Sequence, residues 1–362
     1  MKDRLASIYI GITLVISTLA VVLMVVTGEP AQHEVTAQDA SALSAEEQSG
    51  RDWYIMDEKL AENSFVIPLP NAVEEQDIQV ENDYRKKQFR IILSKISTED
   101  GASVGVSKDY FFGQPVRVNA LTESATVEET EQEITISLAF PAVWEWESKY
   151  ETSLTGNTLH LQLVAPKEKY EKIVVLDAGH GGADRGHIVQ GEDEGILLAE
   201  DTLAYDIVTE AGSVLEKEGI RVYYTRDKNE NPDVTDRVSL ANEVQADMFI
   251  SVHADFSEDT TLYGMRTIYN ETYFIPTFGS ADLAYLLLEK VAANTNEKAI
   301  GFEADSGENE IIRNAMVPVS QLNIGYLSNK QEQKLLEKED YKQRIAEGLC
   351  NAVFAGYEEI EK

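Results

Sequence analysis

The fold of the C-terminal half of this chain is indicated by the segment Ile173-Val174-Val175-Leu176-Asp177-Ala178-Gly179-His180-Gly181-Gly182. It begins with an apolar, mostly β-branched run, as in a strand buried on both faces of a sheet. Similar runs occur at residues 222–225 and 249–252, and apolar residues at helical spacing lie between them. We therefore predict an α/β domain over residues 169–362, with a mostly parallel sheet flanked by helices.

Two histidines follow these predicted strands. His180 lies in the glycine-rich turn after the first strand, and His253 comes directly after residues 249–252. Because sites in open α/β sheets form beyond the carboxyl ends of strands, we expect both imidazoles at one edge. Glu200 begins a predicted helix near that edge. Two histidines and a glutamate are a common ligand set for catalytic Zn²⁺, so the sequence predicts a zinc site.

Further motifs share the order and spacing of a known family. They are Leu176 to Gly182, Thr225-Arg226-Asp227, Asp236-Arg237 with Ala241-Asn242, Ala246 to Ala254, and Gly325 to Asn329. From about residue 173 to 357 the chain resembles zinc-dependent N-acetylmuramoyl-L-alanine amidases of the third type, which trim bacterial peptidoglycan. The resemblance implies zinc ligation by His180, Glu200 and His253, and cleavage between N-acetylmuramic acid and L-alanine of the stem peptide.

The resemblance also covers Arg226 and Arg237, which are candidates for substrate contact. In such loops an arginine more often anchors a carboxylate of the fold, so we favour a structural role for both. His187 stands where the family usually has a small residue. It is a further candidate for contact with substrate or for proton transfer, against the simpler interpretation of an exposed loop histidine.

One position departs from the family at the point where acid–base chemistry is expected. Asn323 stands where the family has a glutamate that serves as general base and proton donor. An amide cannot accept the proton of an attacking water, and positioned acid–base groups contribute about 10² to 10⁴ in rate. Without a substitute, catalysis is expected to be slow.

A second departure offers a substitute. Asp255 occupies the position of a family asparagine, two residues after His253. We expect Asp255 to be the candidate base, with Glu303 and Glu308 as alternatives. The opposing interpretation is that all three are solvated surface acids.

Two functions remain open from the sequence. The first is a peptidoglycan hydrolase, favoured by the intact ligand set. The second is an inactive zinc-binding homologue that binds muropeptides or regulates a wall hydrolase, favoured by Asn323. A zinc peptidase of unrelated mechanism is disfavoured, because the sequence has no His-Glu-x-x-His motif.

The N-terminus predicts export. After Lys2 and Arg4, residues 6–27 form an uncharged run of 22 residues rich in Ile, Leu and Val, enough to cross a bilayer. We predict a signal anchor at residues 1–28, which places the bulk of a single-pass protein on the cell-wall side of the membrane. A cleaved signal peptide, giving a secreted protein, is the alternative. Residues 29–50 are predicted to be a disordered linker.

Residues 51–168 predict a small all-β domain. Apolar and polar residues alternate at 89–93, 134–138 and 159–163, as in antiparallel strands with one buried face. The region resembles the β-rich wall-targeting domains that precede cell-wall amidases. Its aromatic residues could stack on sugars, but core packing is their more common role. They are Phe140, Trp144, Trp146 and Tyr150.

The charge of the chain excludes one class of partner. The chain has 64 acidic and 31 basic side chains and a formal charge of −33, which argues against nucleic acid. Peptidoglycan or muropeptides, and the membrane through the N-terminal helix, are the expected partners.

Cys350 falls on the apolar face of a predicted helix and is expected to be a buried core residue.

Overall fold

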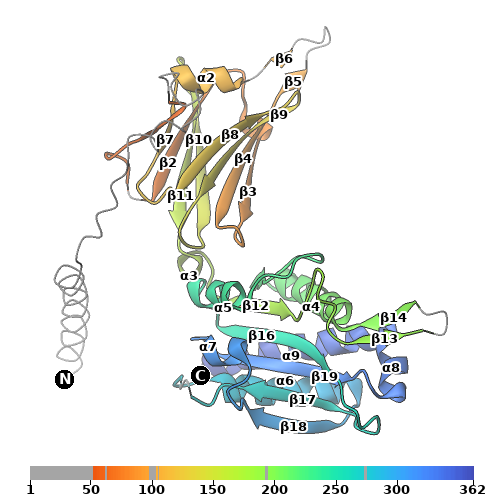
Figure 1. Cartoon of the computed structure of the whole chain (residues 1–362). Helices are drawn as coiled ribbons and strands as arrows, with labels where there is room; N and C mark the ends of the chain where they lie inside the picture. Colours follow the sequence, from red (N-terminus) through yellow and green to blue (C-terminus); the bar gives the residue numbers. More distant parts are fainter. Residues whose placement is uncertain (1–51, 62, 98–102, 105, 192–194, 273–274) are drawn as a thin grey trace, which may run out of the picture. The chain divides into compact units, whose positions relative to one another are not determined.

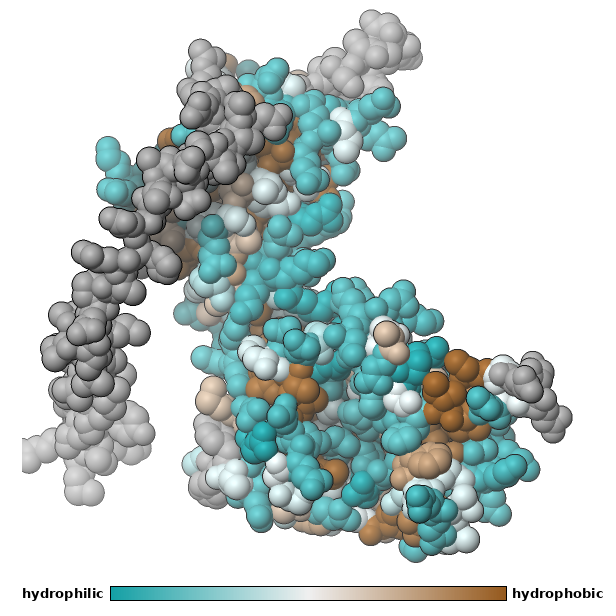
Figure 2. All heavy atoms as spheres, viewed as in Figure 1, coloured by the Kyte–Doolittle hydropathy of each residue, from teal (hydrophilic) through white to brown (hydrophobic). Residues whose placement is uncertain are grey.

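The computed structural model describes residues 52–61, 63–97, 103–104, 106–191, 195–272 and 275–362. The predicted signal anchor and linker therefore lie outside the described residues. Within those ranges, no helix combines the length and apolarity needed to span a membrane. The face seen in Figure 2 is mostly hydrophilic, in keeping with the excess of acidic residues.

The β-rich part of the chain contains two main sheets (Figure 1). One sheet has the order β1-β7-β2-β11-β10 and the other β3-β4-β9-β8, and every pairing except β1 with β7 is antiparallel. The strands are β1 (Tyr54–Met56), β2 (Ser64–Leu69), β3 (Ile78–Asp83), β4 (Gln88–Ser94), β5 (Ile96–Ser97), β6 (Ser103–Val104), β7 (Val116–Val118), β8 (Ser124–Glu129), β9 (Glu133–Ala139), β10 (Glu145–Glu151) and β11 (Asn157–Val164). The short helices are η2 (Glu75–Asp77), α2 (Lys108–Gly113) and α3 (Pro166–Lys169).

Alternation along these strands builds one core between the two sheets. Phe65 and Ile67 of β2 and Ile134 and Ile136 of β9 are fully buried in the same cluster. The aromatic residues proposed for sugar stacking pack here as well: Phe140 is a member of the cluster, and Trp144, Trp146 and Tyr150 pack against it. The contacts thus favour the core-packing interpretation of these side chains.

The C-terminal part is a mixed α/β structure whose sheet has the order β15-β12-β16-β19-β17-β18. Strands β15, β12, β16 and β19 are parallel, which confirms the mostly parallel sheet. The strand β17 runs antiparallel to β19, a reversal that the sequence pattern did not reveal. The strands are β12 (Ile173–Ala178), β13 (Ile188–Gln190), β14 (Ile196–Ala199), β15 (Arg221–Tyr224), β16 (Met248–Asp255), β17 (Met265–Tyr269), β18 (Ala299–Ala304) and β19 (Val319–Tyr326).

Helices cover both faces of this sheet because β12 is apolar on both. Val174 and Leu176 pack in the cluster that contains the apolar residues of α4, α6 and α9, whereas Ile173 and Val175 pack with those of α5 and α7. The helices are α4 (Glu200–Lys217), α5 (Val234–Glu243), α6 (Ser280–Thr295), α7 (Glu310–Asn314), α8 (Lys330–Leu336) and α9 (Glu339–Ile360). Cys350 of α9 is buried, and burial raises the pKa of its thiol to about 12, as expected for an inert core residue.

Candidate metal centre

His180 is presented by a tight turn at the carboxyl end of β12. Its φ of 60° lies in the left-handed region, which costs a non-glycine residue about 1 to 2 kcal/mol. A Cβ at the preceding Gly179 would collide with the His253 ring, so glycine lets the two imidazoles approach each other. Their ring centroids lie 5.0 Å apart at an interplanar angle of 74°.

The two arginines of the family resemblance hold this turn in place. Arg237 pairs with the fully buried Asp177 at 2.6 Å and donates to the His180 carbonyl at 2.8 Å. Arg226 donates to the Ala178 carbonyl at 2.8 Å. The two arginines are only 2% and 4% exposed, so these contacts support the structural role for both rather than substrate contact. Burial alone would raise the pKa of Asp177, but the Arg237 charge and hydrogen bonds lower it below its ordinary value.

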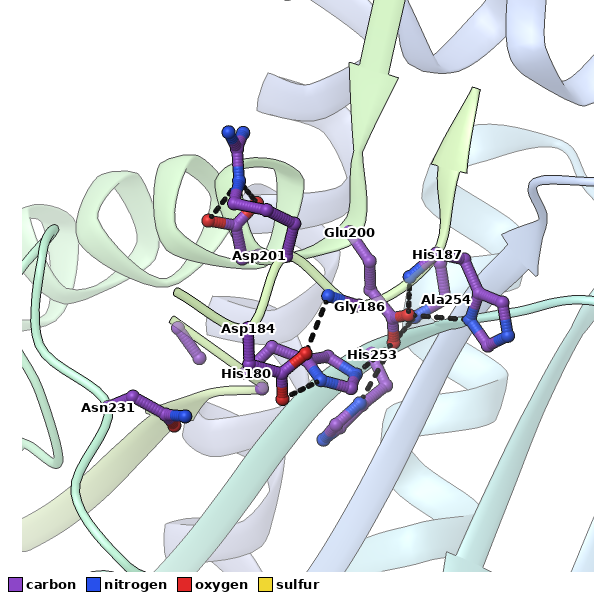
Figure 3. A network of polar contacts seen from close by, with 12 residues as sticks. His180, Asp184, Gly186, His187, Glu200, Asp201, Asn231, His253 and Ala254 are labelled. Carbon is purple, nitrogen blue, oxygen red and sulfur yellow. Dashed lines mark hydrogen bonds and ion pairs between the residues drawn. The ribbon is translucent and has the colours of Figure 1, made fainter. Parts of the chain in front are cut away.

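The three predicted ligands converge at the sheet edge (Figure 3). Oε1 of Glu200 lies 3.2 Å from Nε2 of His180 and 2.9 Å from Nδ1 of His253. One ligand atom from each residue lies within 4.8 Å of the others. Glu200 is 2% exposed and is the first residue of α4, while His253 lies near the end of β16. Two imidazole nitrogens and one carboxylate oxygen in this arrangement fit the donor set of a catalytic zinc site.

Neighbouring groups orient the ligands. Asp184 Oδ2 lies 2.8 Å from His180 Nδ1, which leaves Nε2 of that ring for the site. The backbone N–H of Ala254 donates to Glu200 Oε1 at 3.1 Å. At Gly186 a Cβ would lie 2.7 Å from Glu200 Oε2, so a glycine is needed where the loop passes the carboxylate.

Glu200 and His180 have shifted pKa values because of their contact. Burial would raise the pKa of its carboxyl, but hydrogen bonds from His180 and His253 bring it well below its ordinary value. Hydrogen bonding to Glu200 raises the pKa of His180 to about 9, against the opposing effect of burial, and Asp184 adds to the rise. The carboxylate between the imidazoles therefore attracts positive charge, which a proton on His180 or a metal cation can supply.

Asn323 and Asp255, which differ from the residues that the family resemblance implies, meet beside this cluster. Register pairs His253 of β16 with Asn323 of β19, and Asn323 with Arg266 of β17. Asn323 is 1% exposed, and its Nδ2 donates to Asp255 Oδ1 at 3.1 Å. Arg266 binds both oxygens of Asp255, with Nε and Nη2 at 2.6 and 2.7 Å. The candidate base is thus bound by a guanidinium.

The amide of Asn323 has one orientation. The Asp255 carboxylate can only accept hydrogen bonds, so Asn323 must turn its NH₂ group toward it. Its Oδ1 accepts from Nε2 of Gln321 at 2.7 Å, and Gln321 Oε1 accepts from Asn309. These linked side chains present neither a free carboxylate nor a free carbonyl oxygen at residue 323, where the resemblance implies a glutamate.

A cleft of about 670 Å³ opens beside the cluster. His253, Arg266 and Gln321 line it, so it reaches from the ligand set to the Asn323 network. The alternative bases also line it: Glu303 of β18 bonds Arg266 at 3.0 Å, and Glu308 lies in the following loop. A peptide substrate could therefore reach the cluster from this side.

His187 lies against the ligand set rather than standing free in a loop. Its Nδ1 is 2.8 Å from Glu200 Oε2, and its ring stacks on Phe256 at 5.0 Å with an interplanar angle of 1°. The sequence did not point to Phe256, Asp184 or Arg266. Of these, Asp184 had a usable signal, because it lies four residues after His180 in the same turn. Arg266 had none, since its place depends on the reversed strand β17.

Comparison with known proteins identifies the family of this arrangement. Residues 174–355, half of the chain, match the family described as N-acetylmuramoyl-L-alanine amidase. The chain belongs to this amidase family. The matched residues include all three predicted ligands, Asp255 and Asn323.

Similar proteins occur in bacteria and in a phage. The N-acetylmuramoyl-L-alanine amidase CwlM of Mycobacterium tuberculosis is 27% identical over 184 residues, covering 50% of this chain and 44% of that protein. The endolysin of Bacillus phage SPP1 is 30% identical over 191 residues, covering 50% and 65%. The catalytic domain of CwlV, an amidase from Bacillus (Paenibacillus) polymyxa, aligns with a TM-score of 0.46 and 28% identity, covering 52% and 99%. The chain thus spans less than half the length of the mycobacterial protein.

Proposed function

We propose that this protein is a zinc-dependent peptidoglycan amidase that hydrolyses the bond between N-acetylmuramic acid and L-alanine of the stem peptide. The observation that carries the proposal is the convergence of His180, Glu200 and His253 at one sheet edge, in a chain of the amidase family. The adjoining cleft supplies room for a peptide beside that edge.

The three ligands and their neighbours have different tasks in this proposal. His180, Glu200 and His253 would hold Zn²⁺, which when bound supplies Lewis acidity for activating water and polarising an amide carbonyl. Asp184 keeps the His180 ring in the tautomer that directs Nε2 to the site. Arg237 holds the turn that carries His180, so the ligand is in place before a substrate arrives.

Proton transfer is the weakest part of the site. We propose Asp255 as its base, because Asp255 is the carboxylate in contact with the family's glutamate position. Its two bonds to Arg266 occupy both carboxylate oxygens, so the proton of an attacking water would compete with the guanidinium for them. Turnover should therefore be slower than with a glutamate at residue 323.

A second candidate function rests on the same contacts. An inactive homologue that binds muropeptides, or regulates an active wall hydrolase, needs the cleft and the metal ligands but no base. The observation that favours it is the engagement of Asp255 by Arg266, which leaves the site without an unpaired carboxylate at the Asn323 position.

We further propose that the protein acts on the cell-wall side of the membrane. Relatives named as cell wall amidases support this placement. In this proposal residues 1–28 anchor the chain, residues 29–50 form a linker, residues 51–168 contact the wall and residues 169–362 carry the metal site. The support for the anchor is the uncharged run of residues 6–27.

The test is product analysis. The full chain, loaded with zinc in mild detergent, is incubated with defined muropeptides, and mass spectrometry follows the products. An amidase separates the stem peptide from the intact disaccharide and exposes the amino group of L-alanine. Glu200→Ala should abolish this product. Binding of muropeptides without any separated stem peptide would reject the amidase in favour of the inactive homologue.

A further inference from the structure

The two oxygens of Glu200 have different partners. Oε1 faces the site, where it accepts from His180, His253 and the backbone N–H of Ala254. Oε2 accepts a hydrogen bond from the backbone N–H of His187 at 3.0 Å and lies 2.8 Å from Nδ1 of the same residue. Because a carboxylate can only accept, Nδ1 of His187 carries the hydrogen of this bond.

The hairpin of β13 and β14 brings these residues together. His187 immediately precedes β13 and Glu200 immediately follows β14, and the register pairs Ile188 with Ala199. The Glu200 N–H also donates to the His187 carbonyl at 3.0 Å. The backbone contact is therefore available to any residue at 187, whereas the Nδ1 contact depends on the imidazole.

The imidazole itself is held in one plane. The Phe256 ring stacks on it at 5.0 Å with an interplanar angle of 1°, and the His187 side chain is 49% exposed. Phe256 follows β16 directly, so the pair joins the segment after β16 to the segment before β13. A half-exposed histidine would otherwise sample several rotamers, and the stacked ring limits that freedom.

We propose that His187 is a positioning residue for the metal ligand Glu200. Its Nδ1–H occupies Oε2, so the carboxylate would offer Oε1 alone to a bound cation. This inference rests on the zinc site proposed above. The proposal also explains why residue 187 is a histidine where the family resemblance implies a small residue. The fold does not require a histidine there, because the backbone contacts with Glu200 do not involve the imidazole.

The expected size of the effect follows from other metal sites. Removing a group that hydrogen-bonds a metal ligand typically costs 10-fold to 100-fold in metal affinity. His187→Ala should therefore weaken zinc binding by about 10-fold to 100-fold. His187→Asn, whose side-chain N–H can reach the same oxygen, should recover most of that loss.

Zinc affinity measured by competition with a chromogenic chelator tests the inference on the full chain. His160→Ala is the matched control, because His160 is also a partly exposed histidine beside a glutamate, 3.4 Å from Glu151, but lies on β11. The control should bind zinc as the wild type does. The Co²⁺-substituted His187→Ala protein should show a shifted visible absorption spectrum, which a merely structural role would leave unchanged.

Each outcome decides a separate question. Wild-type protein that takes up no zinc would reject the proposed metal site and this inference with it. Wild-type protein that binds zinc, together with a His187→Ala variant of equal affinity and identical Co²⁺ spectrum, would reject the positioning role alone. If the metal-free wild type and the His187→Ala variant melt at the same temperature, a loss of zinc affinity is a local effect. If the His187→Ala variant melts at a lower temperature, failure of His187→Asn to restore the affinity would overturn the proposal.

Discussion

Nδ2 of Asn323 lies 3.1 Å from Oδ1 of Asp255, so two of the residues that differ from the family pattern are hydrogen-bonded partners. Where the resemblance implies a glutamate on β19 and an asparagine on β16, this chain has the amide on β19 and the carboxylate on β16. This pair of positions therefore keeps one carboxylate, which lies on β16 instead of β19. Arg266 then binds it through both oxygens.

The exchange predicts how activity responds to restoring the family arrangement. In the double variant Asp255→Asn/Asn323→Glu, a carboxylate returns to β19 beside a neutral amide. Turnover of muropeptides should rise by about 10²-fold or more, the range of a positioned acid–base group. Release of stem peptide per unit time measures it.

The single variants separate the contributions to that rise. Asn323→Glu alone places two carboxylates side by side, so it should gain less activity than the double variant. Asp255→Asn alone should abolish residual turnover if Asp255 is the base. Equal rates for wild type, Asp255→Asn and the double variant would contradict the account of both positions.

Arg266 is predicted to stabilise the fold through Asp255. The Arg266→Ala variant removes the charged partner of Asp255, whose side chain is only 12% exposed. Unfolding in urea should show a loss of about 1 to 3 kcal/mol. Arg90→Ala is the control, because the Arg90–Glu81 pair is 41% and 38% exposed and should contribute less than about 1 kcal/mol. Equal losses for both variants would argue against a special role for Arg266.

Arg237 should matter more, because its pair is almost fully buried. Asp177 is 0% and Arg237 4% exposed, and removing one partner leaves the other charge without compensation. We expect Arg237→Ala to cost about 3 to 5 kcal/mol in the free energy of unfolding. It should also weaken zinc binding, because the His180 carbonyl loses its donor. A variant with wild-type stability would disprove the structural assignment of this arginine.

Zinc affinity should depend on pH through His180. Its pKa rises from 6.5 to about 9 in the folded, metal-free protein, so the ring is protonated at neutral pH and must lose that proton to bind a cation. Affinity should increase as pH rises from 6 and level off above about 9. Calorimetric titration between these values measures it, and affinity that stays constant over the whole range would contradict zinc binding through a His180 ring that must first lose a proton.

The same shift has the opposite consequence for the metal-free fold. A raised pKa means that protonated His180 stabilises the folded chain fully below about 6.5, and that this contribution disappears as pH rises through about 9. Denaturant unfolding of metal-free protein should therefore show weaker stability at high pH. The His180→Ala variant should lack that step.

The sequence was sufficient for the parts of the site that depend on local pattern. The run before His180 identified β12, and the turn after it identified the edge at which ligands gather. It was not sufficient for contacts made across the sheet. Arg266 reaches Asp255 only because β17 runs antiparallel beside β19, and nothing in the residues of β17 indicates that reversal.

The role of His187 was hidden for a related reason. Thirteen positions separate it from Glu200 in the sequence, and only the pairing of β13 with β14 brings the two together. The predicted loop gave no register for that hairpin. Phe256 was equally hidden, because an aromatic residue after a strand is common and its partner ring lies in a different loop.

His180, Glu200 and His253 should bind one zinc ion together. The most direct measurement is the zinc content of the full chain after exhaustive dialysis, determined by mass spectrometry of the metal. We predict about one zinc ion per wild-type chain and almost none in Glu200→Ala or His253→Ala, with His160→Ala retaining the wild-type content. Zinc content that is unchanged in the Glu200 and His253 variants would contradict a metal centre shared by these residues.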